Sequence, residues 1–160
     1  MYLVVSNISK RPNIRSLLLT AAAFGCHGVF VVGQRQFDMS PDGPDIPGQI
    51  KTCVKEGRIA IRRFDKWNEC ILYLKENNIK LVGVEIHEDA QNIDDFVAQE
   101  PTADVAFLMG NEGQGLSEKQ MNSCDAFVII SQYGGGTASL NVNVAASIVL
   151  HRFHEYQRTR

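Results

Sequence analysis

The chain has 160 residues and a formal net charge of −2, with 44% apolar and 21% charged residues. This composition excludes a disordered chain, and the near-neutral charge excludes nucleic-acid binding through a globally basic surface. The length suits one domain with a buried core, so we expect a single domain over residues 1–160. Any RNA-binding surface must concentrate its basic residues locally. No apolar run approaches membrane-spanning length, so we predict no contact with a membrane.

The four cysteines are far apart in the sequence and form neither a Cys-x-x-Cys pair nor a zinc-binding spacing. They predict reduced thiols in a cytoplasmic protein. The first residues already read as a strand, so no secretory signal is expected. His151 and His154 lack a carboxylate or cysteine at ligand spacing, which indicates surface or interface histidines rather than a metal site.

The first part of the chain reads as a strand, a helix and a second strand. Residues 2–5 and 28–33 are rich in β-branched and aromatic residues, which favour strands. Apolar residues recur at helical spacing over residues 14–24, with Asn13 as the expected N-cap and Gly25 as the stop. Two strands joined by a helix within about thirty residues imply a parallel pair.

Residues 34–55 form the least regular segment. The stretch 38–48 is rich in Pro, Gly, Asp and Ser, which predicts a loop. Two interpretations stay open, a flap that contacts RNA and an insertion tolerated at the surface. Nearby basic residues either form a rim for phosphates or are scattered over a solvated surface. They are Lys10, Arg11, Arg15, Arg35, Lys51, Lys55, Arg58, Arg62 and Arg63.

The rest of the chain alternates strands and helices. Strands are expected at residues 59–61, 81–86, 104–109 and 126–130, and helices at 66–77, 117–122 and from 139 onward. Ser117 and Gln120 fit a capping box, and Ser139 is the expected N-cap of the last helix. Residues 87–102 read as a polar connection with a short apolar group around Phe96. This order predicts an α/β fold with a mainly parallel sheet and flanking helices.

Two glycine-rich loops follow apolar strands in the second half of the chain. One reads Gly110-Asn111-Glu112-Gly113-Gln114-Gly115, and the other contains three consecutive glycines at 134–136. A strand, a glycine loop and a helix start together offer backbone N–H groups and allow a ligand to approach closely. The pattern favours a small-molecule site, the alternative being a plain flexible loop.

These two stretches resemble the SpoU family of the SPOUT superfamily, the RNA ribose 2′-O-methyltransferases. Gly110, Glu112 and Gly115 match the family's Gly-x-Glu-x-x-Gly motif. Residues 139–145 match its Ser-Leu-Asn-Val-x-Val-Ala motif. The resemblance implies methyl transfer from S-adenosylmethionine to a ribose 2′-hydroxyl of tRNA or rRNA. It also implies a C-terminal deep trefoil knot and a homodimer with its active site near the interface.

The resemblance assigns roles to individual residues. For binding of S-adenosylmethionine it implies Leu108, Gly110, Asn111, Ile130, Gln132, Ser139 and Leu140. For catalysis it implies Asn13, Glu112, Ser139 and Asn141, to which we add Arg15 as a candidate. Transfer needs a ribose oxygen held in line with the methyl group and help in removing its proton. Glu112 has an alternative structural role as a cap for the N–H groups of its loop.

One motif departs from the family pattern in a way that bears on activity. In Asn-x-Gly-x-x-x-Arg, Asn13 matches, but Arg15 replaces the glycine and Leu19 replaces the arginine. The family's arginine is regarded as activating the ribose hydroxyl, which leucine cannot do because it has no donor or charge. Arg15 is the candidate substitute, since residues four apart share a helix face. The alternative function is a catalytically silent SpoU relative that binds S-adenosylmethionine or RNA, and a helper subunit is also possible.

Overall fold

The computed structural model describes residues 1–99, 104–111, 113–135 and 139–159. The strands are β1 (Tyr2–Ser6), β2 (Gly28–Val32), β3 (Ala60–Phe64), β4 (Lys80–Val84), β5 (Gln91–Asn92), β6 (Val105–Met109) and β7 (Ala126–Ile129). The helices are α1 (Arg11–Ala23), α2 (Lys51–Lys55), α3 (Trp67–Glu76), α4 (Ile93–Gln99), α5 (Glu118–Met121) and α6 (Val142–Arg158), with a 3-10 turn η1 (Gly48–Ile50). The strands form one seven-stranded sheet in the order β3-β2-β1-β6-β4-β7-β5, and all neighbouring pairs are parallel. The predicted α/β fold is confirmed.

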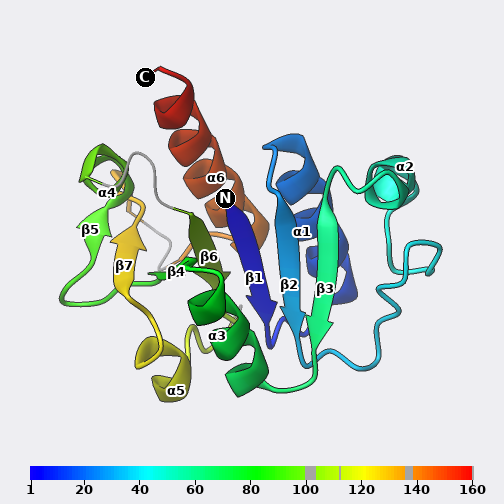
Figure 1. Ribbon diagram of the computed structural model, residues 1–160. Coiled ribbons are helices and arrows are strands. Elements are labelled where there is room, and N and C mark those ends of the chain that lie inside the picture. The colour runs from blue at the N-terminus through cyan, green and yellow to red at the C-terminus, as the bar shows by residue number, and fades with distance from the viewer. Residues whose placement is uncertain (100–103, 112, 136–138, 160) are drawn as a thin grey trace.

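Helices cover both faces of the sheet (Figure 1). On one face, Leu17 of α1 and Phe153 of α6 pack in a core that includes Phe107 of β6. On the other face, Leu74 of α3 packs in a second core with Leu108 of β6. Because both faces are covered, the central strands are buried along their length, which explains their continuous apolar sequences. Among the described residues, no helix has the length and apolar character needed to span a bilayer.

The first helix begins earlier than the sequence pattern predicts. α1 starts at Arg11, and Lys10, not Asn13, occupies the N-cap position. The reason is Pro12, which suits the first helical turn because no backbone N–H is needed there. Asn13 therefore lies inside the helix.

The last helix begins later than predicted, at Val142 rather than directly after Ser139. Its N-cap is Asn141, whose side-chain oxygen accepts hydrogen bonds from the backbone N–H groups of Asn143 at 2.9 Å and Val144 at 3.4 Å. The prediction of Ser139 as N-cap is wrong because the asparagine two residues later satisfies the first-turn N–H groups.

The capping box of α5 is confirmed. Ser117 Oγ accepts from the Gln120 backbone N–H at 3.3 Å, and Gln120 Oε1 accepts from the Ser117 N–H at 2.8 Å. Such a reciprocal pair satisfies two donors at a helix start and holds even a short helix in place.

The irregular segment 34–55 is packed onto the domain. It contains η1 and α2, and its Phe37, Met39 and Ile46 side chains are buried in the core shared with α1. Asp45 is only 2% exposed, and its Oδ2 accepts from the Asp38 N–H at 2.8 Å while its Oδ1 lies 3.1 Å from Nη1 of Arg11. The segment thus contributes to the core and is not a loosely attached insertion.

Several other helix and strand boundaries differ from those that the sequence pattern predicts. The connection 87–102 contains β5 and α4, which the sequence pattern did not predict. β3 extends to Phe64 because it pairs with β2 as an edge strand. β4 ends at Val84, which leaves Glu85 and Ile86 beyond the strand. The last residue of the predicted three-glycine loop, Gly136, lies with residues 137 and 138 outside the described part of the chain.

Candidate functional site

A cavity of about 470 Å³ opens where the carboxyl ends of β4, β6 and β7 meet the start of α6. This volume is typical of small-molecule sites. In parallel sheets, ligands bind beyond the carboxyl ends of the strands, where backbone N–H and C=O groups point out of the ladder. The cavity therefore lies where the architecture itself provides polar backbone groups.

Most residues that the resemblance assigned to the cofactor lie in the wall of this cavity. They are Gly110, Asn111, Ile130, Gln132, Ser139 and Leu140. Leu108 does not line it, because its side chain is fully buried in the core beneath α3. Among the catalytic candidates, Ser139 lines the cavity, Asn141 caps α6 beside it, and Glu112 lies outside the described residues.

The loop after β6 is a tight turn organised by Asn111. Its backbone exchanges two 3.0 Å hydrogen bonds with Gly115, and its Oδ1 accepts from the N–H groups of Gly113 and Gln114 at 2.9 and 3.2 Å. A side chain at Gly110 would approach the Gly115 backbone to 3.0 Å. The glycines of this motif are needed because two backbone segments meet at close range there.

Glu85 is a site residue that the sequence interpretation missed. It lines the cavity, and its Oε2 accepts from the Leu116 N–H at 3.0 Å. Gly115 has a φ of +66°, and a side chain there would collide with this carboxylate. The signal in the sequence is a charged residue directly after an apolar run, but the same apolar pattern predicts a strand through residue 86, whereas β4 ends at Val84. A carboxylate thus faces a predominantly apolar cavity.

The candidate residues of α1 do not line this cavity. Asn13 is half-buried in the first turn, and Arg15 donates from Nη1 to the carbonyl oxygen of Pro44 at 2.8 Å. Leu19 is half-buried and packs against the core shared by α1 and α6. In this chain, Arg15 is bonded to the 34–55 segment rather than directed at the cavity.

Several of the basic residues considered for a phosphate rim have partners within the chain. Arg11 pairs with Asp45 at 3.1 Å and Arg58 with Glu56 at 2.8 Å. Lys55 lies 2.6 Å from Asp42. The pairs of Arg58 and Lys55 are exposed, whereas Arg11 pairs with a buried carboxylate, and each pair reduces the positive charge that these residues offer to a phosphate. Among the described residues, no lysine or arginine lines the 470 Å³ cavity, so its own charged group is the Glu85 carboxylate.

Sequence comparison identifies the family. The model of the SpoU rRNA methylase family matches residues 1–151. This chain belongs to the SpoU rRNA methylase family. An uncharacterized tRNA/rRNA methyltransferase of Mycobacterium sp. (strain KMS) is 27% identical over 159 residues, which are 99% of this chain and 48% of that protein. The chain therefore spans about half the length of the curated relatives it matches.

Solved structures share the fold. The SpoU methyltransferase AviRb from Streptomyces viridochromogenes superposes with a TM-score of 0.77 at 25% identity, over 99% of this chain and 60% of that chain. AviRb has also been solved in complex with the cofactor AdoMet. A structure described as an RNA 2′-O ribose methyltransferase has a TM-score of 0.74 at 24% identity, over 100% of this chain and 57% of that chain.

The cavity fits S-adenosylmethionine by its chemistry as well as its volume. The cofactor carries a positive sulfonium, its methionine end pairs a positive ammonium group with a carboxylate, and it has no phosphate. Such a ligand suits this cavity for three reasons. Its walls include the apolar side chains of Ile86 and Met109, Glu85 supplies a carboxylate, and no lysine or arginine among the described residues lines it. A phosphate group lying against the Glu85 carboxylate would instead be repelled by it.

Proposed function

We propose that this chain is an S-adenosylmethionine-dependent RNA methyltransferase that acts on a ribose 2′-hydroxyl of tRNA or rRNA. The observation that carries the proposal is the 470 Å³ cavity, in whose wall residues of both matched motifs meet. Family membership supports the reaction class, and the AdoMet complex of AviRb supports the cofactor. The names of the curated relatives support RNA as the substrate. The choice of the ribose hydroxyl rests on the two motifs.

In this proposal the cavity residues bind and orient the reactants. Backbone groups of Gly110, Ile130 and Leu140, with the Gln132 side chain, hold the cofactor, and Glu85 attracts its positive charge. When bound, S-adenosylmethionine supplies the electrophilic methyl group. Ser139 orients the ribose, because a hydroxyl can both donate and accept a hydrogen bond. Holding the 2′-oxygen in line for displacement supplies a large part of the rate enhancement.

The remaining catalytic candidates act on the proton and the ribose. Asn141 has amide N–H groups that can donate to a ribose oxygen while its side-chain oxygen caps α6. Glu112 accepts the proton of the 2′-hydroxyl, or else caps the N–H groups of its loop. Asn13 and Arg15 contact the RNA from α1.

We further propose that the active form is a homodimer. Tyr133, which is 96% exposed, and Val144, which is 45% exposed, present apolar surface beside the cavity that a second copy would cover. A partner could also bring Asn13 and Arg15 of its α1 to this cavity, which those of the same chain do not line. Light scattering should give a mass of twice 17.8 kDa, and a monomer at all concentrations would contradict the proposal.

The second candidate function is a catalytically silent relative that binds S-adenosylmethionine or RNA. The observation that favours it is Leu19, which packs into the core where the family has arginine. The contact between Arg15 and the Pro44 carbonyl oxygen adds weight, because it occupies the candidate substitute. A Leu19→Arg variant separates the two functions. A large gain in methyl transfer supports a silent parent, whereas no gain in an already active protein indicates that another residue replaces the arginine.

The proposed function is tested by transfer of labelled methyl groups from S-adenosylmethionine into total tRNA and rRNA. We expect label in alkali-resistant dinucleotides, because a 2′-O-methyl group blocks cleavage at that position. Glu112→Ala should reduce incorporation by about 100-fold if Glu112 acts on the proton. If calorimetry shows cofactor binding but no methyl group enters the RNA, the result favours the catalytically silent relative. Activity would then require a helper subunit.

A further inference from the structure

A second cavity, of about 230 Å³, lies at the carboxyl ends of β1 and β2. Its other walls come from the start of α3 and from α5 with its cap. Of the residues assigned to the cofactor or to catalysis, none that the structure describes lines it, so the proposed active site does not account for it. Its volume is too small for S-adenosylmethionine but suits a fragment of the size of a nucleobase.

The aromatic wall of this cavity is Trp67, the first residue of α3. Its indole Nε1 donates a hydrogen bond to Ser123 Oγ at 3.0 Å, which fixes the orientation of the ring. The residue is half-buried, so part of its surface is accessible to a ligand. A pre-oriented aromatic surface of this kind is what proteins use to stack an unpaired nucleobase.

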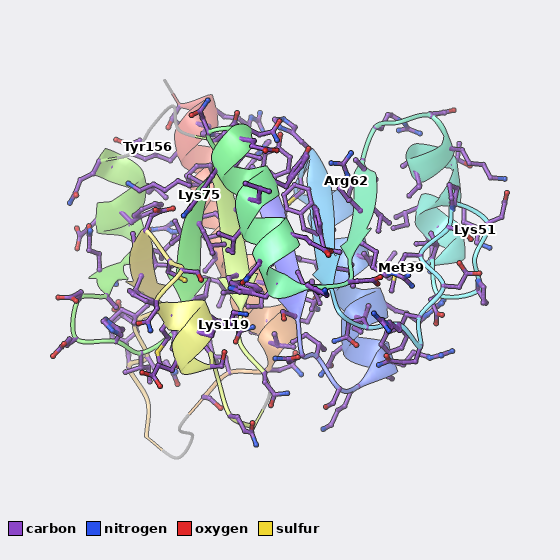
Figure 2. The ribbon with its side chains drawn as sticks, turned by 60° about the horizontal axis from the view of Figure 1, so that its bottom comes forward. Met39, Lys51, Arg62, Lys75, Lys119 and Tyr156 are labelled. Atoms are coloured by element: carbon purple, nitrogen blue, oxygen red, sulfur yellow. The ribbon has the colours of Figure 1, made fainter. Side chains whose placement is uncertain are left out.

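The polar groups around Trp67 match the edges and the backbone of a nucleotide. Lys119 of α5 is exposed at the rim and offers a cation for a phosphate (Figure 2). Ser6 and Gln120 are 5% exposed and contribute polar atoms to the wall. Asp65 adds acceptor oxygens, and its charge is compensated because Oδ1 lies 3.5 Å from Nη2 of Arg63.

The two cavities are adjacent, and a hydrogen bond joins a residue in the wall of one to a residue in the wall of the other. Asn111, in the wall of the first cavity, donates from Nδ2 to the carbonyl oxygen of Asn7 at 2.6 Å, and Asn7 lines the second cavity. Both cavities lie at the carboxyl edge of the same sheet, since β1 and β6 are parallel neighbours. An RNA strand with one nucleotide at the first cavity can therefore reach the second with a neighbouring nucleotide.

We infer that the second cavity is an RNA subsite, in which a nucleobase near the target nucleotide stacks on Trp67 while Lys119 binds the adjoining phosphate. This inference rests on the proposed action on RNA and goes beyond it, because it assigns a separate binding site outside the cofactor cavity. A base held there would fix which ribose lies at the methyl donor. The subsite thus contributes to the choice of nucleotide in the RNA.

The chain contains one tryptophan, so its fluorescence reports on this cavity alone. We would titrate the intact protein with total tRNA and with a short single-stranded RNA, correcting for absorption with free tryptophan amide. Stacking should quench Trp67 emission in a saturable manner, with and without S-adenosylmethionine. In parallel, anisotropy of labelled RNA measures binding independently of Trp67.

A matched pair of lysine variants tests the phosphate contact. Lys119→Ala should lower RNA affinity and reduce the slope of log affinity against log salt by about one. Lys75→Ala is the control, because this exposed lysine lies near the other end of α3, about 12 Å along the helix from Trp67 (Figure 2). Neither lysine has been placed in the cofactor site, so cofactor binding should be unchanged in both variants.

The outcomes separate this inference from the proposed function. RNA binding by anisotropy without quenching of Trp67, or equal salt slopes for the two variants, would overturn the subsite and leave the methyltransferase proposal standing. Failure to bind any RNA would overturn both. The subsite is supported by saturable quenching of Trp67 fluorescence together with a smaller salt dependence of RNA affinity in Lys119→Ala but not in Lys75→Ala.

Discussion

Asn141 shows how one residue can serve both folding and chemistry. Its side-chain oxygen caps α6 through the N–H groups of Asn143 and Val144. The same residue matches the asparagine of the family's Ser-Leu-Asn-Val-x-Val-Ala motif, and its amide N–H groups remain as donors directed by that cap. The structural and the proposed chemical roles can be separated by substitution, because only the oxygen is needed for capping.

At this residue we predict that Asn141→Ala lowers the free energy of unfolding by about 1 kcal/mol, whereas Asn141→Asp keeps it. Aspartate retains an accepting oxygen at the helix start but lacks the amide donor. Methyl transfer should therefore fall in both variants while urea denaturation distinguishes them. Full activity in Asn141→Asp would show that the residue is a cap only.

At the scale of elements, α1 carries the Asn-x-Gly-x-x-x-Arg motif and α6 the end of the Ser-Leu-Asn-Val-x-Val-Ala motif, and the two helices pack side by side on one face of the sheet (Figure 1). A part-buried hydrogen bond joins them, from Thr20 Oγ1 to Asn143 Oδ1 at 2.8 Å. Thr20 follows Leu19, the residue that stands where the resembled family has arginine. This bond therefore fixes the position of α1 directly beside Leu19. The orientation of the two helices depends on it as well as on apolar packing.

For this helix pair we predict that Thr20→Val lowers the free energy of unfolding by about 1 kcal/mol, because a part-buried acceptor loses its donor. The double variant Thr20→Val, Asn143→Ala should lose less free energy of unfolding than the two single variants lose together, by at least about 0.5 kcal/mol. Thr52→Val on α2 is the control, since Thr52 is exposed. Additive costs in chemical denaturation would show that the bond contributes nothing to stability.

At the scale of the whole molecule, the two cores bury thiols. Burial raises the pKa of Cys26, Cys70 and Cys124 from 9.0 to about 12 in each case. The folded chain therefore keeps these thiols neutral at a pH where the unfolded chain ionises them. By linkage, their contribution to stability is fully present below pH 9 and is lost as the pH rises toward 12.

We accordingly predict that the free energy of unfolding decreases as the pH rises above 9, by at most about 1.4 kcal/mol per pH unit for each thiol. Urea denaturation at several alkaline pH values measures this slope. Cys70→Ala should make the slope shallower, because one buried thiol is removed. A slope that is the same in Cys70→Ala as in the parent protein would exclude ionisation of this buried thiol as the cause.

Much of the fold was predictable because its signals are local. The apolar runs at residues 28–33 and 104–109 indicated buried parallel strands, since both sides of each strand are covered. The Ser117 and Gln120 spacing predicted a cap that involves only four residues. Helix starts were less predictable, because Asn13 and Ser139 were plausible caps with nearby competitors at Lys10 and Asn141.

By itself, the sequence determined the α/β class, the motif residues and the family resemblance, because strand patterns and glycine turns are written in consecutive residues. Only the tertiary structure decided that Glu85, Asn111 and Gln132 share one cavity, since the sheet order places β4 between β6 and β7. It also decided that Arg15 bonds the Pro44 carbonyl oxygen and that Trp67 faces a second cavity. Such contacts join residues distant in sequence, and they form only when the chain closes around its sheet.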